Sequence, residues 1–314
     1  MKPTSTEVIV EFTDNQILQQ VVGSHDAHLH YLEDHLNIDI SNRGNLLSIH
    51  GPKDATQHAK RILQSLYEQV TLGHDVSPAQ IDALLRLGTK RTKGPKKNIH
   101  ITTTRKETIF PRSPQQSLYM EALECKELIF GIGPAGTGKT FLAVAAGVSL
   151  LLHGKVDRLV ISRPAVEAGE RLGFLPGDLK EKADPYLRPI YDSLHLLLTP
   201  EKVSRFLAEG TIEVALLAFM RGRTLNNAFI ILDEAQNTTV QQMKMFLTRM
   251  GVQSYMVITG DPSQIDLPRG EISGLTHALH ILEKIPEIAR VTLTEKDIVR
   301  HPLVSKIVQA YEQS

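Results

Sequence analysis

The sequence contains one cysteine, no tryptophan and no long apolar segment. Because Cys125 has no second cysteine to pair with, an intramolecular disulfide is excluded and an oxidising compartment is not indicated. No segment approaches the roughly 20 consecutive apolar residues that a membrane helix needs, and residues 1–7 lack the apolar run of a secretion signal. We therefore expect a cytoplasmic protein without membrane contacts, in which Cys125 is a buried structural thiol of an apolar helix.

An excess of charge of either sign is also absent. Lysine plus arginine and aspartate plus glutamate number 35 each, so no net field attracts the chain to nucleic acid or membranes. Any such binding must come from a local patch. The length of 314 residues favours two domains, and hydrophobic residues, at 41%, suffice for a sizeable core.

Residues 1–72 predict a small α+β domain. The predicted elements are, in order, a strand at residues 7–12, a helix from Asp14 to Gly23, a helix from Ser24, strands at 38–41 and 46–49, and a helix at 53–70. This β-α-α-β-β-α order resembles a KH-type RNA-binding domain.

The GXXG loop with which KH-type domains grip phosphate is incomplete here. The corresponding residues are Gly23-Ser24-His25-Asp26, in which an aspartate that repels phosphate replaces the second glycine. Residues 1–70 also hold nine acidic and five basic side chains. Two interpretations stay open: a KH-like domain that binds RNA, and a docking domain built on the same fold. The histidines at 25, 28, 30 and 35 lack the thiolate partners and spacing of zinc sites, which favours helix-surface histidines.

Residues 73–108 predict a basic linker. Eight basic residues occur between positions 86 and 106 without one acid, and Gly94-Pro95 breaks any helix there. They are Arg86, Lys90, Arg91, Lys93, Lys96, Lys97, Arg105 and Lys106. Two interpretations have similar weight: a solvated hinge, and a segment whose cations neutralise RNA phosphates in a salt-sensitive way.

Residues 109–314 predict a mostly parallel α/β sheet flanked by helices. Apolar, strand-like runs alternate with helical stretches, as in a sheet that is buried on both faces. The candidate strands are 128–132, 158–161, 213–217, 229–232, 255–259 and 290–293.

A glycine-rich segment after the first of these strands matches G-x-x-x-x-G-K-[ST] in full. It consists of Gly133, Pro134, Ala135, Gly136, Thr137, Gly138, Lys139 and Thr140. An apolar helix follows, so the backbone N–H groups and the helix N-terminus are placed to cradle phosphates of ATP. Lys139 is expected to reach the β- and γ-phosphates, and Thr140 to offer its hydroxyl to Mg²⁺.

Two carboxylates follow the apolar strand at 229–232. Because ligands bind at the carboxyl ends of parallel strands, we expect Asp233 to face the Mg²⁺ that Thr140 binds. Glu234 is then placed to orient and deprotonate an attacking water, which favours a hydrolase over a small-molecule kinase. A GTPase is disfavoured because the sequence contains no Asn-Lys-x-Asp.

A polar turn, Thr259-Gly260-Asp261-Pro262-Ser263-Gln264, follows the next strand. Its amide can bond the γ-phosphate or the attacking water. In combination, Gly133–Thr140, Leu232-Asp233-Glu234-Ala235-Gln236-Asn237 and this turn resemble the PhoH-like ATPases, relatives of the first RecA-like domain of superfamily 1 helicases. Further segments fit the same family: residues 116–119, 162–170, 173–178 and 300–304. The resemblance covers about residues 110–314.

The resemblance implies roles for four further side chains. Gln116 would contact adenine, Arg163 would lie near the phosphates or bound nucleic acid, and Gln264 would sense the γ-phosphate. Arg300 is either an arginine finger, in its own or a neighbouring subunit, or a solvated or salt-bridged residue. Little sequence follows Arg300, so we expect a single core. Single RecA-like cores commonly form rings in which a neighbour supplies this charge, so the resemblance also implies a homo-oligomer.

The same resemblance implies a Mg²⁺-dependent ATP hydrolase of RNA metabolism. Such a protein would remodel RNA or ribonucleoproteins, in rRNA maturation for example, with an endoribonuclease as partner. The alternative is an ATP-dependent switch or scaffold that docks protein partners without acting on RNA. The acidic N-terminal residues favour the alternative, and the basic linker favours the first interpretation.

Overall fold

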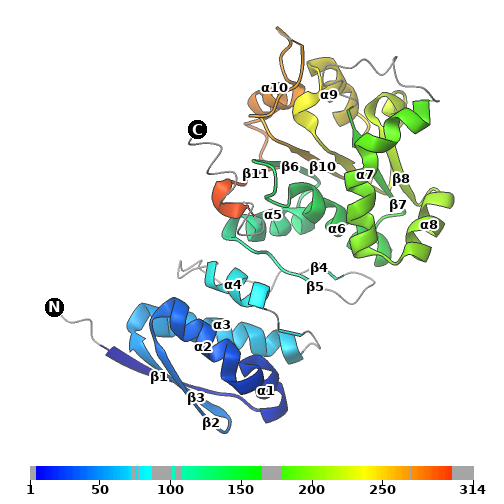
Figure 1. Ribbon diagram of the computed structural model, residues 1–314. Coiled ribbons are helices and arrows are strands. Elements are labelled where there is room, and N and C mark those ends of the chain that lie inside the picture. Colours follow the sequence, from blue (N-terminus) through cyan, green and yellow to red (C-terminus); the bar gives the residue numbers. More distant parts are fainter. Residues whose placement is uncertain are drawn as a thin grey trace. The chain divides into compact units, whose positions relative to one another are not determined.

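The computed structural model describes residues 5–71, 75–76, 78–86, 101–102, 108–164, 179–268 and 270–298. The chain divides into two compact units (Figure 1). Each unit has its own hydrophobic core. The first comprises Met1–Ile99 with Phe110–Pro114, and the second comprises His100–Ile109 with Gln115–Ser314. Within the described ranges, none of the helices combines the length and the hydropathy that a membrane span requires.

The first unit is a three-stranded antiparallel sheet with helices packed on one face. Its elements are β1 (Ser5–Glu11), α1 (Asn15–Val22), α2 (Ala27–Leu36), β2 (Asp39–Arg43), β3 (Leu46–Pro52) and α3 (Lys53–Thr71). The sheet order is β1-β3-β2. Leu47 and Ile49 of β3 are fully buried, because alternate residues of the strand point to the core. The predicted order of elements is therefore confirmed, whereas the KH-like interpretation stays a prediction.

The second helix begins later than predicted. His25 and Asp26 have φ values of 54° and 57°, in the left-handed region, so Ser24–Asp26 form a short 3₁₀ turn, η1, and α2 begins at Ala27. By contrast, the start of the first helix at Asp14 is confirmed, since its carboxylate accepts hydrogen bonds from the N–H groups of Gln16 and Ile17.

The segment predicted as a linker contains structure that belongs to both units. Helix α4 (Pro78–Arg86) places Ile81, fully buried, in the core of the first unit, so that unit extends beyond residue 72. In the second unit, β4 (Ile101–Thr102) pairs with β5 (Thr108–Ile109). The basic residues of this segment from Lys90 to Lys106 lie outside the described residues.

The second unit is built on a six-stranded sheet in which all neighbouring strands are parallel. The strands are β6 (Leu128–Ile132), β7 (Arg158–Arg163), β8 (Ile212–Leu216), β9 (Ala228–Leu232), β10 (Tyr255–Gly260) and β11 (Ile288–Thr292), and their order is β11-β6-β10-β9-β7-β8. All six predicted strands are confirmed, and so is the mostly parallel α/β fold.

Helices cover both faces of this sheet (Figure 1). They are α5 (Pro114–Cys125), α6 (Lys139–Leu152), α7 (Leu179–Leu197), α8 (Pro200–Ala208), α9 (Val240–Leu247) and α10 (Gly274–Ile281), with the 3₁₀ turns η3 (Leu217–Met220), η4 (Ala235–Asn237) and η5 (Glu295–Asp297). Helices α9 and α10 form one core with the sheet through Phe246, Leu275 and Ile258. Burial on both faces explains why the inner strands β6, β7, β9 and β10 are almost uninterrupted apolar runs.

The prediction for Cys125 was wrong. The residue is exposed at the last position of α5. The buried face of this helix carries Tyr119, Met120 and Leu123. Two residues beyond Leu123, the helix has turned by more than half a revolution, so Cys125 lies away from that face.

Candidate nucleotide-binding site

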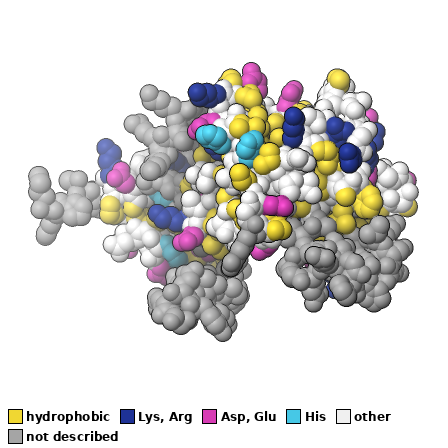
Figure 2. Space-filling view, turned by 90° about the horizontal axis from the view of Figure 1, so that it is seen from above, with side chains coloured by type: hydrophobic (Ala, Val, Ile, Leu, Met, Phe, Trp, Pro, Cys, Tyr) yellow, Lys and Arg dark blue, Asp and Glu magenta, His cyan; other side chains and the backbone are white. Residues whose placement is uncertain are grey.

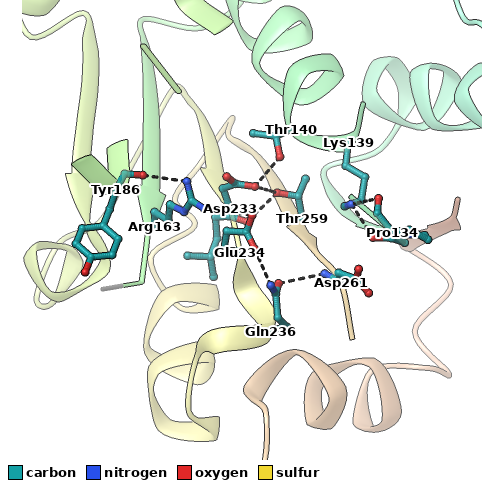
Figure 3. A network of polar contacts seen from close by, with 12 residues as sticks. Pro134, Lys139, Thr140, Arg163, Tyr186, Asp233, Glu234, Gln236, Thr259 and Asp261 are labelled. Carbon is teal, nitrogen blue, oxygen red and sulfur yellow. Dashed lines mark hydrogen bonds and ion pairs between the residues drawn. The ribbon is translucent and has the colours of Figure 1, made fainter. Parts of the chain in front are cut away.

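The sheet order brings three segments to one edge. Strand β10 lies between β6 and β9, the glycine-rich loop follows β6, Asp233 follows β9, and Thr259 and Asp261 lie at the end of β10. Because the strands are parallel, their carboxyl ends meet at the same edge. Figure 3 shows the polar side chains that gather there.

The loop between β6 and α6 is tightly packed at its first residue. Gly133 has φ 143°, and a Cβ at this position would lie 2.3 Å from the carbonyl oxygen of Leu293. No other residue type fits this conformation and this contact. The Gly133 N–H donates to the carbonyl of Gly260 at 3.1 Å, which ties the loop to β10. The loop ends where α6 begins at Lys139, so the positive end of that helix faces the loop.

Lys139 is folded onto the loop itself. Its Nζ donates to the carbonyl oxygens of Gly133 at 2.6 Å and Pro134 at 2.8 Å, and the residue is 9% exposed. Burial lowers the pKa of Lys139. The nearby carboxylates of Asp261, Glu234 and Asp233 raise it, but the effect of burial is larger. The ammonium is thus already hydrogen-bonded, and a phosphate would have to take the place of the two carbonyls.

Oxygen atoms suited to a magnesium ion lie directly beside the loop. The hydroxyl of Thr140 donates to Asp233 Oδ1 at 2.6 Å, and that of Thr259 donates to the same oxygen at 2.8 Å. Asp233 is 4% exposed. Among the described residues, no three His, Cys, Asp or Glu side chains are grouped as they would be to hold a metal ion. Mg²⁺ characteristically binds through one or two carboxylates together with nucleotide phosphates, and these residues fit such a site.

Glu234 is held by two side chains. Its Oε1 lies 3.2 Å from an Nη of Arg163, and its Oε2 accepts a hydrogen bond from Gln236 Nε2 at 2.6 Å. The other Nη of Arg163 donates to the carbonyl of Tyr186 at 2.9 Å. Glu234 has φ 53°, a left-handed conformation that costs a non-glycine residue energy and occurs preferentially at functional sites.

Gln236 connects Glu234 to β10, a role that sequence reasoning missed. Its Oε1 accepts from the backbone N–H of Asp261 at 3.1 Å, and its own carbonyl accepts from the hydroxyl of Ser273 at 2.7 Å. The residue is 1% exposed. The available signal was its place two residues after Glu234, where an amide can both donate and accept.

The remaining predicted site residues lie at the margin of this cluster or outside it. Gln116 is buried, and its Nε2 donates to the carbonyl of Thr137 at 3.0 Å, so it contacts the loop. Gln264 lies on the exposed loop after β10, where its backbone N–H donates to the carbonyl of Asp261 at 3.0 Å. Arg300 and residues 165–178 lie outside the described residues. The adenine, γ-phosphate and arginine-finger roles stay predictions.

Comparison with known proteins identifies the family. A family model described as PhoH-like protein matches residues 108–312. The PhoH-like protein of Mycobacterium tuberculosis (strain ATCC 25618 / H37Rv) is 48% identical over 294 residues, 93% of this chain and 84% of that protein. The PhoH-like protein of Bacillus subtilis (strain 168) is 47% identical over 295 residues, 93% of this chain and 92% of that protein. Protein PhoH of Escherichia coli (strain K12) is 45% identical over 205 residues, 65% of this chain and 58% of that protein.

The matched region contains the six-stranded sheet, the glycine-rich loop and the carboxylate pair. This combination is the α/β fold of a P-loop NTPase, a fold that binds nucleotides and usually Mg²⁺. The chain belongs to the PhoH-like protein family.

Proposed function

We propose that this protein hydrolyses ATP in a Mg²⁺-dependent reaction and acts in RNA metabolism. The observation that carries the proposal of hydrolysis is Glu234, which lies next to Asp233 and is held at both carboxylate oxygens by Arg163 and Gln236. A carboxylate fixed beside the predicted phosphate site is placed to take a proton from water. A phosphotransferase to another acceptor has no need to activate water.

Each side chain of the site has a separate role in the proposed hydrolysis of ATP. Lys139 leaves the loop carbonyls and neutralises charge on the phosphates, and Gln264 contacts the γ-phosphate or the attacking water. Glu234 orients the water and accepts its proton. Thr140 and Asp233 would hold Mg²⁺, which neutralises charge that develops on the phosphate oxygens.

The basic segment supports a link to RNA. Eight Lys and Arg residues between positions 86 and 106 occur without an acid, and each cation that meets a phosphate adds salt-sensitive affinity. On the face shown in Figure 2, acidic and basic side chains are interspersed over the described residues. We assign the electrostatic contact with RNA to the basic segment. We further propose that the protein remodels RNA or ribonucleoproteins, for example in rRNA maturation, together with an endoribonuclease partner.

The acidic N-terminal residues favour a second candidate function. Residues 1–70 contain nine acidic and five basic side chains, and this excess of negative charge disfavours binding of RNA phosphates by that unit. In this alternative the ATP state controls the docking of protein partners, and RNA does not take part.

Steady-state ATP hydrolysis with and without single-stranded RNA tests the proposal, with Glu234→Gln as the blank. We expect RNA to stimulate turnover and added salt to remove the stimulation. Turnover that RNA leaves unchanged at every salt concentration would favour the docking switch. Hydrolysis by wild type no faster than by the blank would reject the hydrolase itself.

The assay needs a range of protein concentrations, because we also propose a homo-oligomeric ring in which Arg300 completes a neighbouring site. An arginine finger is worth roughly 10³-fold to 10⁵-fold in rate. Turnover per subunit should then rise with concentration in wild type. In Arg300→Ala it should be low at every concentration.

A further inference from the structure

One carboxylate oxygen of the site has no hydrogen-bond partner within the described part of the chain. Three buried side-chain atoms share this property, namely Gln69 Oε1, Ser162 Oγ and Asp261 Oδ2. Only Asp261 carries a charge, and it is 6% exposed. A buried carboxylate oxygen without a donor is unfavourable, because the desolvation of the charge is not compensated.

Asp261 lies on the side of β10 that faces Asp233. Side chains alternate along a strand, so Asp261 shares a side with Thr259, two residues before it, whose hydroxyl bonds Asp233 Oδ1. Figure 3 shows Asp261 between Gln236 and the loop residues Lys139 and Pro134. Ser162 differs from it: on β7 it shares a side with Val160, which packs in the core under α9 and α10.

The two oxygens of Asp261 have separate environments. Oδ1 accepts from the backbone N–H of Ser263 at 3.0 Å and from its hydroxyl at 2.6 Å, and so holds the loop after β10. Oδ2 does not accept a hydrogen bond from the ammonium of Lys139, because that group donates to the carbonyl oxygens of Gly133 and Pro134. A role for Asp261 in shaping the loop accounts for Oδ1 and leaves Oδ2 unexplained.

We infer that Asp261 Oδ2 accepts a hydrogen bond from a water ligand of the Mg²⁺ that enters with the nucleotide, so that Asp261 is an outer residue of the metal site. The inference rests on the proposed function. Mg²⁺ sheds its water reluctantly and keeps several water ligands in proteins. Those waters donate strongly, and a buried carboxylate oxygen on the same side as Asp233 and Thr259 is a matching acceptor.

The test separates metal affinity from nucleotide affinity. Asp261→Asn keeps an oxygen for Ser263 but replaces Oδ2 by a donor, which cannot accept from a metal-bound water. In the full chain, Mn²⁺ affinity is measured by electron paramagnetic resonance with a non-hydrolysable ATP analogue present. The affinity for a fluorescent analogue is measured in EDTA. We expect Mn²⁺ affinity to fall about 10-fold to 100-fold, as for other outer residues of metal sites, and metal-free nucleotide affinity to stay unchanged.

Asp266→Asn is the matched control, because Asp266 is exposed on the same loop and contacts Asn237 only through its backbone N–H. It should leave both affinities unchanged. If Asp261→Asn does not fold, Asp261→Glu is a second variant, which keeps the charge but displaces it. It should also lower the affinity for Mn²⁺ and leave the metal-free nucleotide affinity unchanged. Equal losses of both affinities would assign Asp261 to the loop or to Lys139 and overturn the inference, as would unchanged Mn²⁺ affinity. A wild type that binds no nucleotide in either condition would instead reject the proposed function, and the inference with it.

Discussion

The guanidinium of Arg163, at the end of β7, lies 3.2 Å from the carboxylate of Glu234, which follows β9 (Figure 3). The two side chains are 19% and 38% exposed, so solvent screens the pair only in part. Gln236 occupies the other oxygen of Glu234. Together the two partners fix the direction of the carboxylate, which is the group proposed to accept the proton of the attacking water.

We expect Arg163→Ala to lower ATP turnover roughly 10-fold or more, a part of the 10²-fold to 10⁴-fold that a positioned base contributes. Nucleotide affinity should change little, since Arg163 contacts Glu234 and the carbonyl of Tyr186. Arg188→Ala, at an exposed position of α7, is the control. A loss of affinity as large as the loss of turnover would place Arg163 at the phosphates instead.

Glu234→Gln should bind ATP with wild-type affinity and release phosphate at least about 100-fold more slowly. The amide keeps the size of the carboxylate but cannot accept the proton of the attacking water. Binding of a fluorescent ATP analogue and phosphate release, measured on the same preparation, separate the two effects. Wild-type hydrolysis by this variant would show that another group is the base.

The buried ammonium of Lys139 predicts opposite pH dependences for nucleotide binding and for stability. Burial lowers its pKa from the usual 10.5, so the folded protein loses this proton at a lower pH than the unfolded chain. Nucleotide affinity should fall as pH rises through the lowered pKa, because phosphate needs the ammonium. Over the same window the unfolded chain binds more protons, so the nucleotide-free protein should gain stability with rising pH.

Lys139→Ala provides the comparison for both pH series. It should abolish nucleotide binding at every pH and remove this part of the pH dependence of unfolding. Titrations of a fluorescent ATP analogue and urea unfolding, each at several pH values, check the two signs. If the stability against urea depended on pH in the same way in wild type and Lys139→Ala, the titrating group would be another residue.

The sheet and the glycine-rich loop could be predicted because the sequence patterns that indicate them are local. The four inner strands, β6, β7, β9 and β10, are largely buried apolar runs, and Gly133–Thr140 match a complete motif between a strand and a helix. Burial on both faces of a parallel sheet leaves that signature in the sequence itself. The proximity of Thr140 and Asp233 also followed, because parallel strands end at one edge, whereas their shared role at Mg²⁺ stays a prediction.

The contacts around Glu234 could not be predicted, because they depend on strand order. In the sequence β8 separates β7 from β9, whereas in the sheet β9 lies directly between β7 and β10 and β8 is at the edge. That order brings Arg163 to Glu234 from one side and Asp261 to Gln236 from the other. Likewise, the left-handed residues His25 and Asp26 are not glycines, and no sequence rule placed a helix break there.

Replacement of Gly131 by alanine should destabilise the second unit by about 1–3 kcal/mol, the usual cost of overpacking a core. An added Cβ would lie 2.6 Å from Cε2 and 2.7 Å from the hydroxyl of Tyr119, a fully buried residue that donates to the carbonyl of Lys139 at 3.3 Å. Urea unfolding measures the loss, with Thr276→Ala, exposed on α10, as control. In a Tyr119→Leu background the same replacement should cost less, because the ring it meets is gone. An equal cost in both backgrounds would mean that the strain lies in β6 itself.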